Sequence, residues 1–188
     1  MSVTVLTTCH PAYAPFLPAC IASVLQQTVQ PAYHRISMDF RDGWPVPQLN
    51  EMARGCTTEF VSQLAADDVA HPDHLEKLLD ASAGADIIWS WCRVLGRPGW
   101  SPNSDFDADR LQRENYIPAT SLVRTELLAD LGWWNPDAEN GWEDWDLWRR
   151  ALDAGAVFRC VPEVTWTYRL DHGMNATFNG FRKRQVPA

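Results

Sequence analysis

The sequence lacks several features that define common protein classes. It has no apolar run of the ~18 residues that a membrane-spanning helix requires, and its first residues lead directly into a strand-like segment instead of a secretion signal. The five cysteines are an odd number and no two are spaced as CxxC, which argues against a zinc ribbon or a disulfide scaffold and favours a reducing compartment. We therefore expect a cytoplasmic protein without a transmembrane segment.

Glycine-rich phosphate loops and positive charge are also scarce. Neither GxGxxG nor GxxxxGKS/T occurs, which disfavours Rossmann dinucleotide binding and P-loop chemistry. The 24 acidic residues outnumber the 16 basic ones and give a formal net charge of −8, whereas proteins that bind nucleic acid non-specifically are usually basic. One basic cluster, Arg182-Lys183-Arg184, is either a solvated tail or a contact for an anionic acceptor.

Tryptophan, in contrast, is abundant. The 188 residues suit a single domain, and they include 10 Trp against 4 Tyr and 7 Phe. Half of the tryptophans flank one acidic segment: Trp133, Trp134, Trp142, Trp145 and Trp148. Helical spacing would also allow both Trp145 and Trp148 to be core residues. We expect Trp134, Trp142 and Trp145 to bind the faces of sugar rings.

Hydrophobic periodicity predicts alternating strands and helices. The expected strands are 3–8, 33–40, 59–64, 85–91, 117–123, 156–161 and 164–169, and the expected helices are 17–25, 49–53, one from 72, 125–131 and 143–154. Residues 96–109 are rich in Pro, Gly, Asn, Ser and Asp, and we interpret them as a long mobile loop. This alternation is typical of an α/β domain with a mostly parallel central sheet flanked by helices, which binds ligands at the carboxyl ends of its strands.

Two pairs of carboxylates are candidates for chemistry. Asp67 and Asp68 end an apolar strand, where they would either bind Mg²⁺ or Mn²⁺ together with substrate phosphates or cap the following helix. Glu143 and Asp144 begin a helix, whose dipole favours ionised carboxylates, so they are either a charged first turn or a general base. His172 follows the last strand and is a metal ligand, a diphosphate contact or a surface residue.

Over about residues 3–175 these segments resemble the family 2 glycosyltransferases, which have the GT-A fold. Residues 17–28 match the family pattern L-x-x-C-I/L-x-S-V/I-L-x-Q-T, and residues 64–76 are similar to its L-D-A-D-D…P…L-E segment, with Ala65 in place of the first Asp. Residues 141–148 resemble the acceptor-side block with its Glu-Asp pair, and Tyr168-Arg169 with His172 resemble the Y-R-x-H ending.

The resemblance implies a role for each matching residue. Asp144 would be the catalytic base with Glu143 beside it, and Asp68 would hold Mn²⁺ or Mg²⁺ with His172. The implied nucleotide contacts are Thr8, Cys9, His10, Asp39 or its rival Asp42, Asn50, Arg54 and Asp67. Residues 1–175 would form one GT-A-like catalytic domain, with a donor half at about 1–95, an acceptor half at about 115–175 and a tail at 176–188.

The implied reaction is the inverting, metal-dependent transfer of a sugar from a nucleotide-diphospho-sugar, expected to be a UDP-sugar, to an acceptor hydroxyl. The acceptor is a glycan, a lipid-linked sugar, a protein or a modified nucleic acid, and the chain is a monomer or a homodimer. Because Ala65 replaces the first Asp of the family segment, an alternative is a degenerate transferase that binds sugar or nucleotide without catalysis. A nucleotidyltransferase is a weaker alternative, because its first loop is normally Gly-rich with a basic residue.

Overall fold

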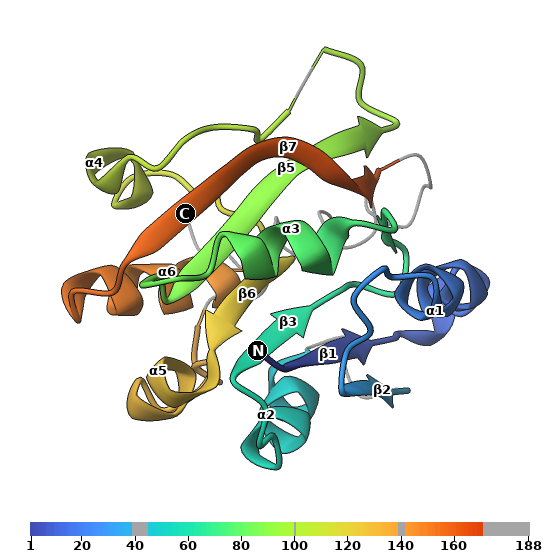
Figure 1. The fold of residues 1–188 in the computed structure, drawn as a ribbon, viewed down its shortest axis with the longest axis horizontal. Helices are drawn as coiled ribbons and strands as arrows, with labels where there is room; N and C mark the ends of the chain where they lie inside the picture. Colours follow the sequence, from blue (N-terminus) through green and yellow to red (C-terminus); the bar gives the residue numbers. More distant parts are fainter. Residues whose placement is uncertain (39–44, 100, 139–141, 171–188) are drawn as a thin grey trace, which may run out of the picture.

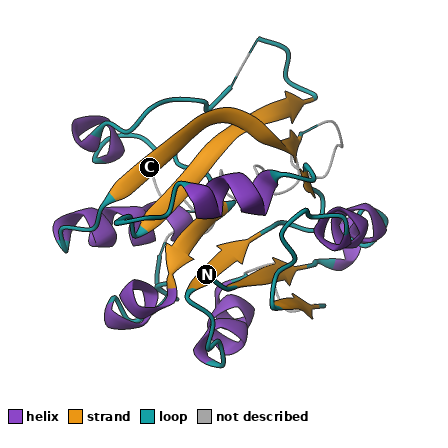
Figure 2. Ribbon diagram, in the orientation of Figure 1, coloured by secondary structure: helices purple, strands orange, loops and turns teal. Residues whose placement is uncertain are grey.

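The fold is a seven-stranded sheet with helices on both faces (Figure 1, Figure 2). The computed structural model describes residues 1–38, 45–99, 101–138 and 142–170, so the predicted ligands Asp39, Asp42 and His172 and the basic cluster lie outside the described residues. The strands are β1 (Val3–Thr8), β2 (Tyr33–Ser37), β3 (Phe60–Gln63), β4 (Val69–Ala70), β5 (Ile87–Leu95), β6 (Ser121–Arg124) and β7 (Phe158–Arg169). The helices are α1 (Leu17–Leu25), α2 (Val46–Arg54), α3 (His74–Asp80), α4 (Ala108–Leu111), α5 (Thr125–Asp130) and α6 (Glu143–Asp153).

The strand order is β2-β1-β3-β6-β5-β7-β4. β1 pairs in parallel with β2 and β3, and β5 pairs in parallel with β7. β6 runs antiparallel between β3 and β5, and the short β4 runs antiparallel to the end of β7. Five strands therefore point in the same direction, as the α/β prediction requires. The reversed direction of β6 and the short strand β4 were not predicted.

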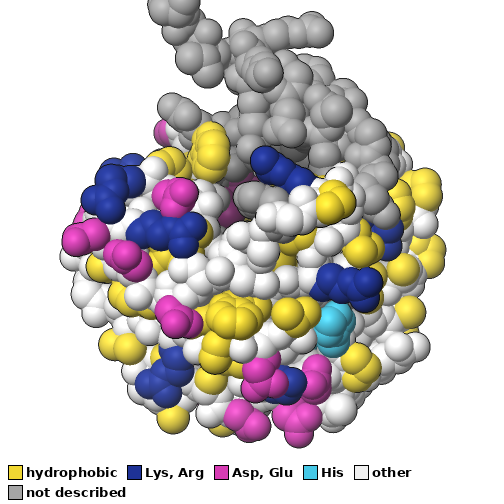
Figure 3. Space-filling view, turned by 90° about the horizontal axis from the view of Figure 1, so that it is seen from above, with side chains coloured by type: hydrophobic (Ala, Val, Ile, Leu, Met, Phe, Trp, Pro, Cys, Tyr) yellow, Lys and Arg dark blue, Asp and Glu magenta, His cyan; other side chains and the backbone are white. Residues whose placement is uncertain are grey.

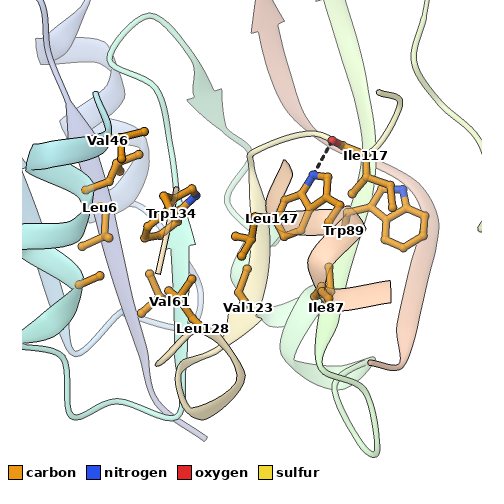
Figure 4. Packing of buried hydrophobic residues seen from close by; sticks show 14 of the residues in the cluster. Leu6, Val46, Val61, Ile87, Trp89, Ile117, Val123, Leu128, Trp134 and Leu147 are labelled. Carbon is orange, nitrogen blue, oxygen red and sulfur yellow. Dashed lines mark hydrogen bonds between the residues drawn. The ribbon is translucent and has the colours of Figure 1, made fainter. Parts of the chain in front are cut away.

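Each face of the sheet is covered by its own apolar cluster. Alternate residues of a strand point to opposite faces, so Ile87 and Ile88 belong to different clusters. One cluster packs α2 and α6 against the sheet and buries Trp89, Trp134 and Trp148 (Figure 4). The Trp148 indole Nε1 donates to the Ile117 carbonyl at 3.0 Å, so this ring is anchored as well as buried. The other cluster packs α1 and α3 on the opposite face.

The last two predicted strands are one continuous strand, β7. Its register against β5 shifts where Ser90 pairs with Val161 and Trp91 pairs with Val164. Pro162 lies in this irregularity, where its missing N–H removes no ladder hydrogen bond. A bulge breaks the alternation of apolar and polar residues without ending the strand, so the sequence predicted two strands where the structure has one.

The segment interpreted as a mobile loop is packed onto the sheet. The Asn103 side chain accepts from the Cys92 N–H at 2.7 Å and donates to the Cys92 carbonyl at 2.9 Å, as a neighbouring strand would. Phe106 stacks on Phe158 with ring centroids 4.8 Å apart. The mobile-loop interpretation is therefore wrong for residues 101–107. Within the described ranges, the helices are all too short or too polar to cross a membrane.

Candidate active site

A cavity of about 250 Å³ brings together the two carboxylates predicted to do chemistry. Asp68, which follows β3, and Asp144, in the first turn of α6, both line it. Trp166 and Tyr168 of β7 and the segment 115–120 complete much of its wall. Residues 115–120 lead into β6, which runs antiparallel to β3, so this segment passes beside the end of β3. Pro102 also lines the cavity, so the packed segment 101–107 helps to shape it.

Asp68 is held deep in the cavity wall. Asp68 is only 3% exposed, and its Oδ1 accepts a hydrogen bond from the Arg169 backbone N–H at 2.9 Å. Burial raises the pKa of Asp68 well above its ordinary value, and the charge of Asp67 raises it further. The N–H and the guanidinium of Arg169 act in the opposite direction on the pKa. A buried carboxylate beside a second acid is a position that a cation would stabilise.

The loop after β1 reaches the same edge of the sheet. The Cys9 N–H donates to the Ser37 carbonyl at 2.9 Å, and the His10 Nδ1 accepts the Ala12 N–H at 3.2 Å to cap a short turn. Burial raises the pKa of Tyr13 to about 12, with further contributions from the charges of Asp67 and Asp68. The predicted nucleotide loop at residues 8–10 therefore lies near Asp67 and Asp68, although the Cys9 side chain itself is buried.

Asp144 is positioned by two donors. Its Oδ1 accepts the Trp145 backbone N–H at 2.7 Å and the Asn115 Nδ2 at 3.0 Å. The first turn of a helix also favours negative charge, and α6 carries Glu143, Asp144 and Asp146 there. The sequence analysis missed Asn115, because it belongs to no motif and lies 29 positions away in the sequence. The only sequence signal for Asn115 is its place between a polar segment and the apolar Tyr116-Ile117.

Comparisons with known proteins agree on the fold. No family model matches the chain. A Bacillus subtilis protein named as an uncharacterized glycosyltransferase, YwdF, is 27% identical over 132 residues, which cover 63% of this chain and 48% of that protein. TarS of S. aureus, solved with UDP-GlcNAc, superposes on 92% of this chain and 60% of its own with a TM-score of 0.74 and 13% identity. This is the GT-A glycosyltransferase fold.

A second GT-A structure supports the same conclusion. The mannosyltransferase PcManGT of Pyrobaculum calidifontis, in complex with GDP-Man and Mn²⁺, has a TM-score of 0.65 and 14% identity over 99% of this chain. The chain covers 65% of that protein, 60% of the TarS fragment and about half of the curated relative. The fold class predicted from the sequence is thus confirmed.

The GT-A fold places two predicted nucleotide contacts elsewhere. The Asn50 side chain is 7% exposed and clamps Trp134, accepting its N–H at 3.0 Å and donating to its carbonyl at 2.8 Å. Arg54 ends α2, which returns the chain to the amino end of β3 because β1, β2 and β3 are parallel. That end is opposite to the carboxyl ends, where residues 8–10 lie. Asn50 and Arg54 therefore do not lie with the other predicted nucleotide contacts.

The tryptophans divide into core and surface. Trp134 is 3% exposed and belongs to the core, so the prediction that it binds a sugar is wrong. Trp142 and Trp145 meet edge to face at 5.5 Å and line a separate groove of about 390 Å³ beside Asp146, Arg149 and Asp153. Their rings therefore flank Asp144 in the sequence but border a second hollow in the structure.

The residues present are compatible with a divalent ion at Asp68. Across the described residues, no group of three or more His, Cys, Asp or Glu side chains is placed to hold a metal by itself. Mg²⁺ and Mn²⁺ are commonly held by one or two carboxylates together with substrate phosphates. The buried Asp68, with its raised pKa and the neighbouring Asp67, is a donor set of this kind.

Proposed function

We propose that this chain is the catalytic core of a glycosyltransferase that moves a sugar from a nucleotide-diphosphate donor, with a UDP-sugar as the expected donor, to an acceptor hydroxyl. The observation that carries the proposal is that Asp68 and Asp144 line one cavity. The names of YwdF, a glycosyltransferase, and of PcManGT, a mannosyltransferase, support transfer chemistry, and the UDP-GlcNAc bound to TarS and the GDP-Man bound to PcManGT support a nucleotide-sugar donor.

The two carboxylates suit opposite ends of such a reaction. Asp144 would take the proton of the acceptor hydroxyl while its oxygen forms a bond to the anomeric carbon. The bond to the diphosphate would break on the opposite side, which inverts the anomeric centre. A divalent ion, Mn²⁺ or Mg²⁺, would supply Lewis-acid stabilisation of the leaving diphosphate when bound at Asp68, with His172 as a further ligand.

Donor and acceptor would approach from different sides of the cavity. Thr8, His10 and Asp67 would contact the nucleotide, with Asp39 or Asp42 expected to join them. Trp142 and Trp145 would bind the acceptor in their groove, because flat indole rings match the apolar faces of sugars. On the face shown in Figure 3, Lys and Arg side chains are interspersed with acidic ones, so this face offers little to a polyanionic acceptor.

A transfer assay with Mn²⁺ and either UDP-GlcNAc or GDP-mannose tests the proposal. Asp144→Asn should reduce kcat about 1000-fold, because an amide cannot accept the hydroxyl proton, while donor affinity stays unchanged. The matched control is Asp130→Asn, an exposed carboxylate at the end of α5 that lines neither the cavity nor the groove. Normal turnover by Asp144→Asn would contradict the assigned base.

Wild-type binding without any transfer would favour the degenerate alternative. Ala65 lines the cavity where the family pattern has a carboxylate, so the chain has one acidic group fewer there. Donor binding by calorimetry, measured beside the transfer assay, separates the two possibilities. Binding with slow donor hydrolysis would still indicate an enzyme.

A further inference from the structure

The polar side chains around the cavity differ in whether they can bind a ligand there. The Asn115 Oδ1 and the Trp166 Nε1 are inaccessible to solvent, so neither atom faces the hollow. The Tyr116 hydroxyl is engaged by Asp107, because it donates to the Asp107 carbonyl at 2.9 Å and accepts the Asp107 N–H at 2.7 Å. These three groups of the cavity wall are therefore closed off or already hydrogen-bonded.

Gln63, the last residue of β3, is different. It lines the same cavity and is partly exposed. Its amide has no hydrogen-bond partner within the part of the chain that the structure describes, and neither amide atom is closed off from solvent as the Asn115 Oδ1 is. A glutamine amide carries one acceptor oxygen and two donor hydrogens. Both kinds of group in Gln63 are therefore available to a ligand.

The strand places Gln63 on the face of the sheet that carries the proposed base. Alternate residues of a strand share a face, so Gln63 points to the same side as Val61, which packs in the apolar cluster of α6. Asp144 lies in the first turn of α6 on that side. Ser62 pairs with Leu122 of β6, so Gln63 comes level with the end of the segment 115–120. Gln63 and Asp144 thus approach the cavity from one side of the sheet.

The neutrality of Gln63 matters because its neighbours in the sequence are acidic. Asp67 and Asp68 follow the same strand, and burial with the charge of Asp67 already raises the pKa of Asp68. Ala65, between Gln63 and these acids, also lines the cavity and has no polar side-chain group. Gln63 therefore offers hydrogen bonds without a third negative charge near the proposed diphosphate. Such an amide suits an uncharged group, as hydroxyl and acetamido groups are.

The size of the cavity and its two carboxylates indicate which part of the donor Gln63 meets. About 250 Å³ lies below the range of ~300–1,000 Å³ for pockets that enclose drug-sized ligands, so the cavity suits one sugar ring and not a whole nucleotide-sugar. Under the proposed function, the transferred sugar lies between the diphosphate at Asp68 and the base at Asp144. The ribose carries hydroxyls as well, but it lies beyond the diphosphate from the base.

We propose that Gln63 is a specificity-determining residue that hydrogen-bonds a hydroxyl or acetamido group of the transferred sugar. The amide would favour sugars that place such a group within its reach over epimers that direct it elsewhere, because an unmatched polar group loses its hydrogen bond. This inference rests on the proposed function for the identity of the ligand, and it names the residue that selects the sugar.

Calorimetry in the presence of Mn²⁺ measures how much the sugar adds to binding, as the ratio of the affinities for UDP-GlcNAc and UDP. Gln63→Leu keeps the size of the side chain and removes the amide. It should leave the UDP affinity unchanged and weaken UDP-GlcNAc binding about tenfold. Gln26→Leu, which removes an exposed amide at the end of α1 that lines neither the cavity nor the groove, is the control and should change neither affinity.

The same titrations with UDP-glucose, UDP-galactose and GDP-mannose test selectivity. The first two differ only in the orientation of one hydroxyl. Gln63→Leu should weaken the best-bound nucleotide-sugar about tenfold and the others less than about twofold, so that the preference of the wild type narrows. A purely structural role would instead weaken UDP and every nucleotide-sugar together and lower the melting temperature. If Gln63→Leu does not fold, Gln63→Asn, whose amide is one methylene shorter, should show the same selective loss.

The proposal is overturned if none of the four nucleotide-sugars binds the wild type more tightly than its nucleoside diphosphate, or if Gln63→Leu leaves that gain intact. It is also overturned if Gln63→Leu weakens UDP by the same factor, because the amide would then contact the nucleotide. In each case, wild-type transfer that is lost in Asp144→Asn would still support the proposed function. Conversely, normal turnover by Asp144→Asn would contradict the proposed base, while the binding ratios, which need no turnover, would continue to report on Gln63.

Discussion

Asp68 and Asp144 line one cavity, yet the chain surrounds them differently. Asp68 is buried beside a second acid, and burial with the charge of Asp67 raises its pKa. Asp144 lies at the start of α6, where two N–H donors converge on its Oδ1 and the helix dipole favours negative charge. Asp144 thus receives hydrogen-bond donors from the protein, whereas burial beside Asp67 makes Asp68 a position that a cation would stabilise. This contrast fits the proposed roles of Asp144 as a base and of Asp68 as a metal ligand.

The largest expected effect concerns the metal at Asp68. Mn²⁺ with UDP should raise the melting temperature of the wild type by about 5–10 °C when both are near 100 times their dissociation constants, because binding to the native state stabilises it. Asp68→Asn should abolish most of this increase. Asp73→Asn, an exposed carboxylate five residues away, is the control and should keep it. If Mn²⁺ with UDP stabilises Asp68→Asn as much as the wild type, Asp68 does not hold the metal.

A smaller effect is expected at the acceptor end. Trp142→Ala should raise the acceptor KM about fivefold, since one stacking contact contributes about 1 kcal/mol. The donor affinity and the melting temperature should stay close to those of the wild type, because Trp142 is only half-buried. Initial rates over a range of acceptor concentrations test this, with Trp148→Phe as a core variant that should lower stability instead. An unchanged acceptor KM would leave the groove without a role in acceptor binding.

The smallest effect on activity comes from a histidine behind the wall that carries Asp68. The His74 Nδ1 is bonded to the Thr165 hydroxyl at 2.6 Å, which in turn bonds the Ser90 hydroxyl at 2.6 Å. Burial lowers the pKa of His74 from 6.5 to about 3, so the ring stays neutral in the folded state. Below pH 6.5 the unfolded chain binds this proton and the folded chain does not, so stability falls as the pH falls toward 3.

Denaturant unfolding at several pH values checks this expectation. The wild type should lose up to ~1.4 kcal/mol of stability per pH unit from this group between pH 6.5 and 3. His74→Asn keeps a polar atom near Thr165 and should show a correspondingly shallower decline, with normal transfer at neutral pH. Parallel pH profiles of the two proteins would show that His74 does not titrate on unfolding.

Several helices and strands could be predicted closely from the sequence. β1 has the predicted bounds, and α1 follows the spacing of Leu17, Ile21 and Val24, because short local segments with strong periodicity carry most of this information. α6 begins at Glu143, as the acidic first turn predicts. The position of β6 could not be predicted, because strand order depends on tertiary packing and leaves no trace in local pattern.

The sequence identified those candidate site residues whose side-chain type and position in an element suggest a chemical role. Asp68 and Asp144 are recognisable as carboxylates at a strand end and a helix start, and the structure brings them together. Asn115 is recognisable only by its contact with Asp144, which no spacing reveals. Asn50 was expected at the nucleotide only from its place in the family pattern, and the sequence does not reveal that its amide instead clamps the buried Trp134 backbone.

Donor titration of Asp68→Asn and Asp144→Asn side by side, with and without Mn²⁺, tests the central contrast most directly. Asp144→Asn should bind UDP-GlcNAc or GDP-mannose as tightly as the wild type, with the same gain from Mn²⁺, and yet fail to transfer the sugar. Asp68→Asn should bind the donor weakly and gain nothing from Mn²⁺. Metal-dependent donor binding that survives in Asp68→Asn, or is lost in Asp144→Asn, would contradict the account.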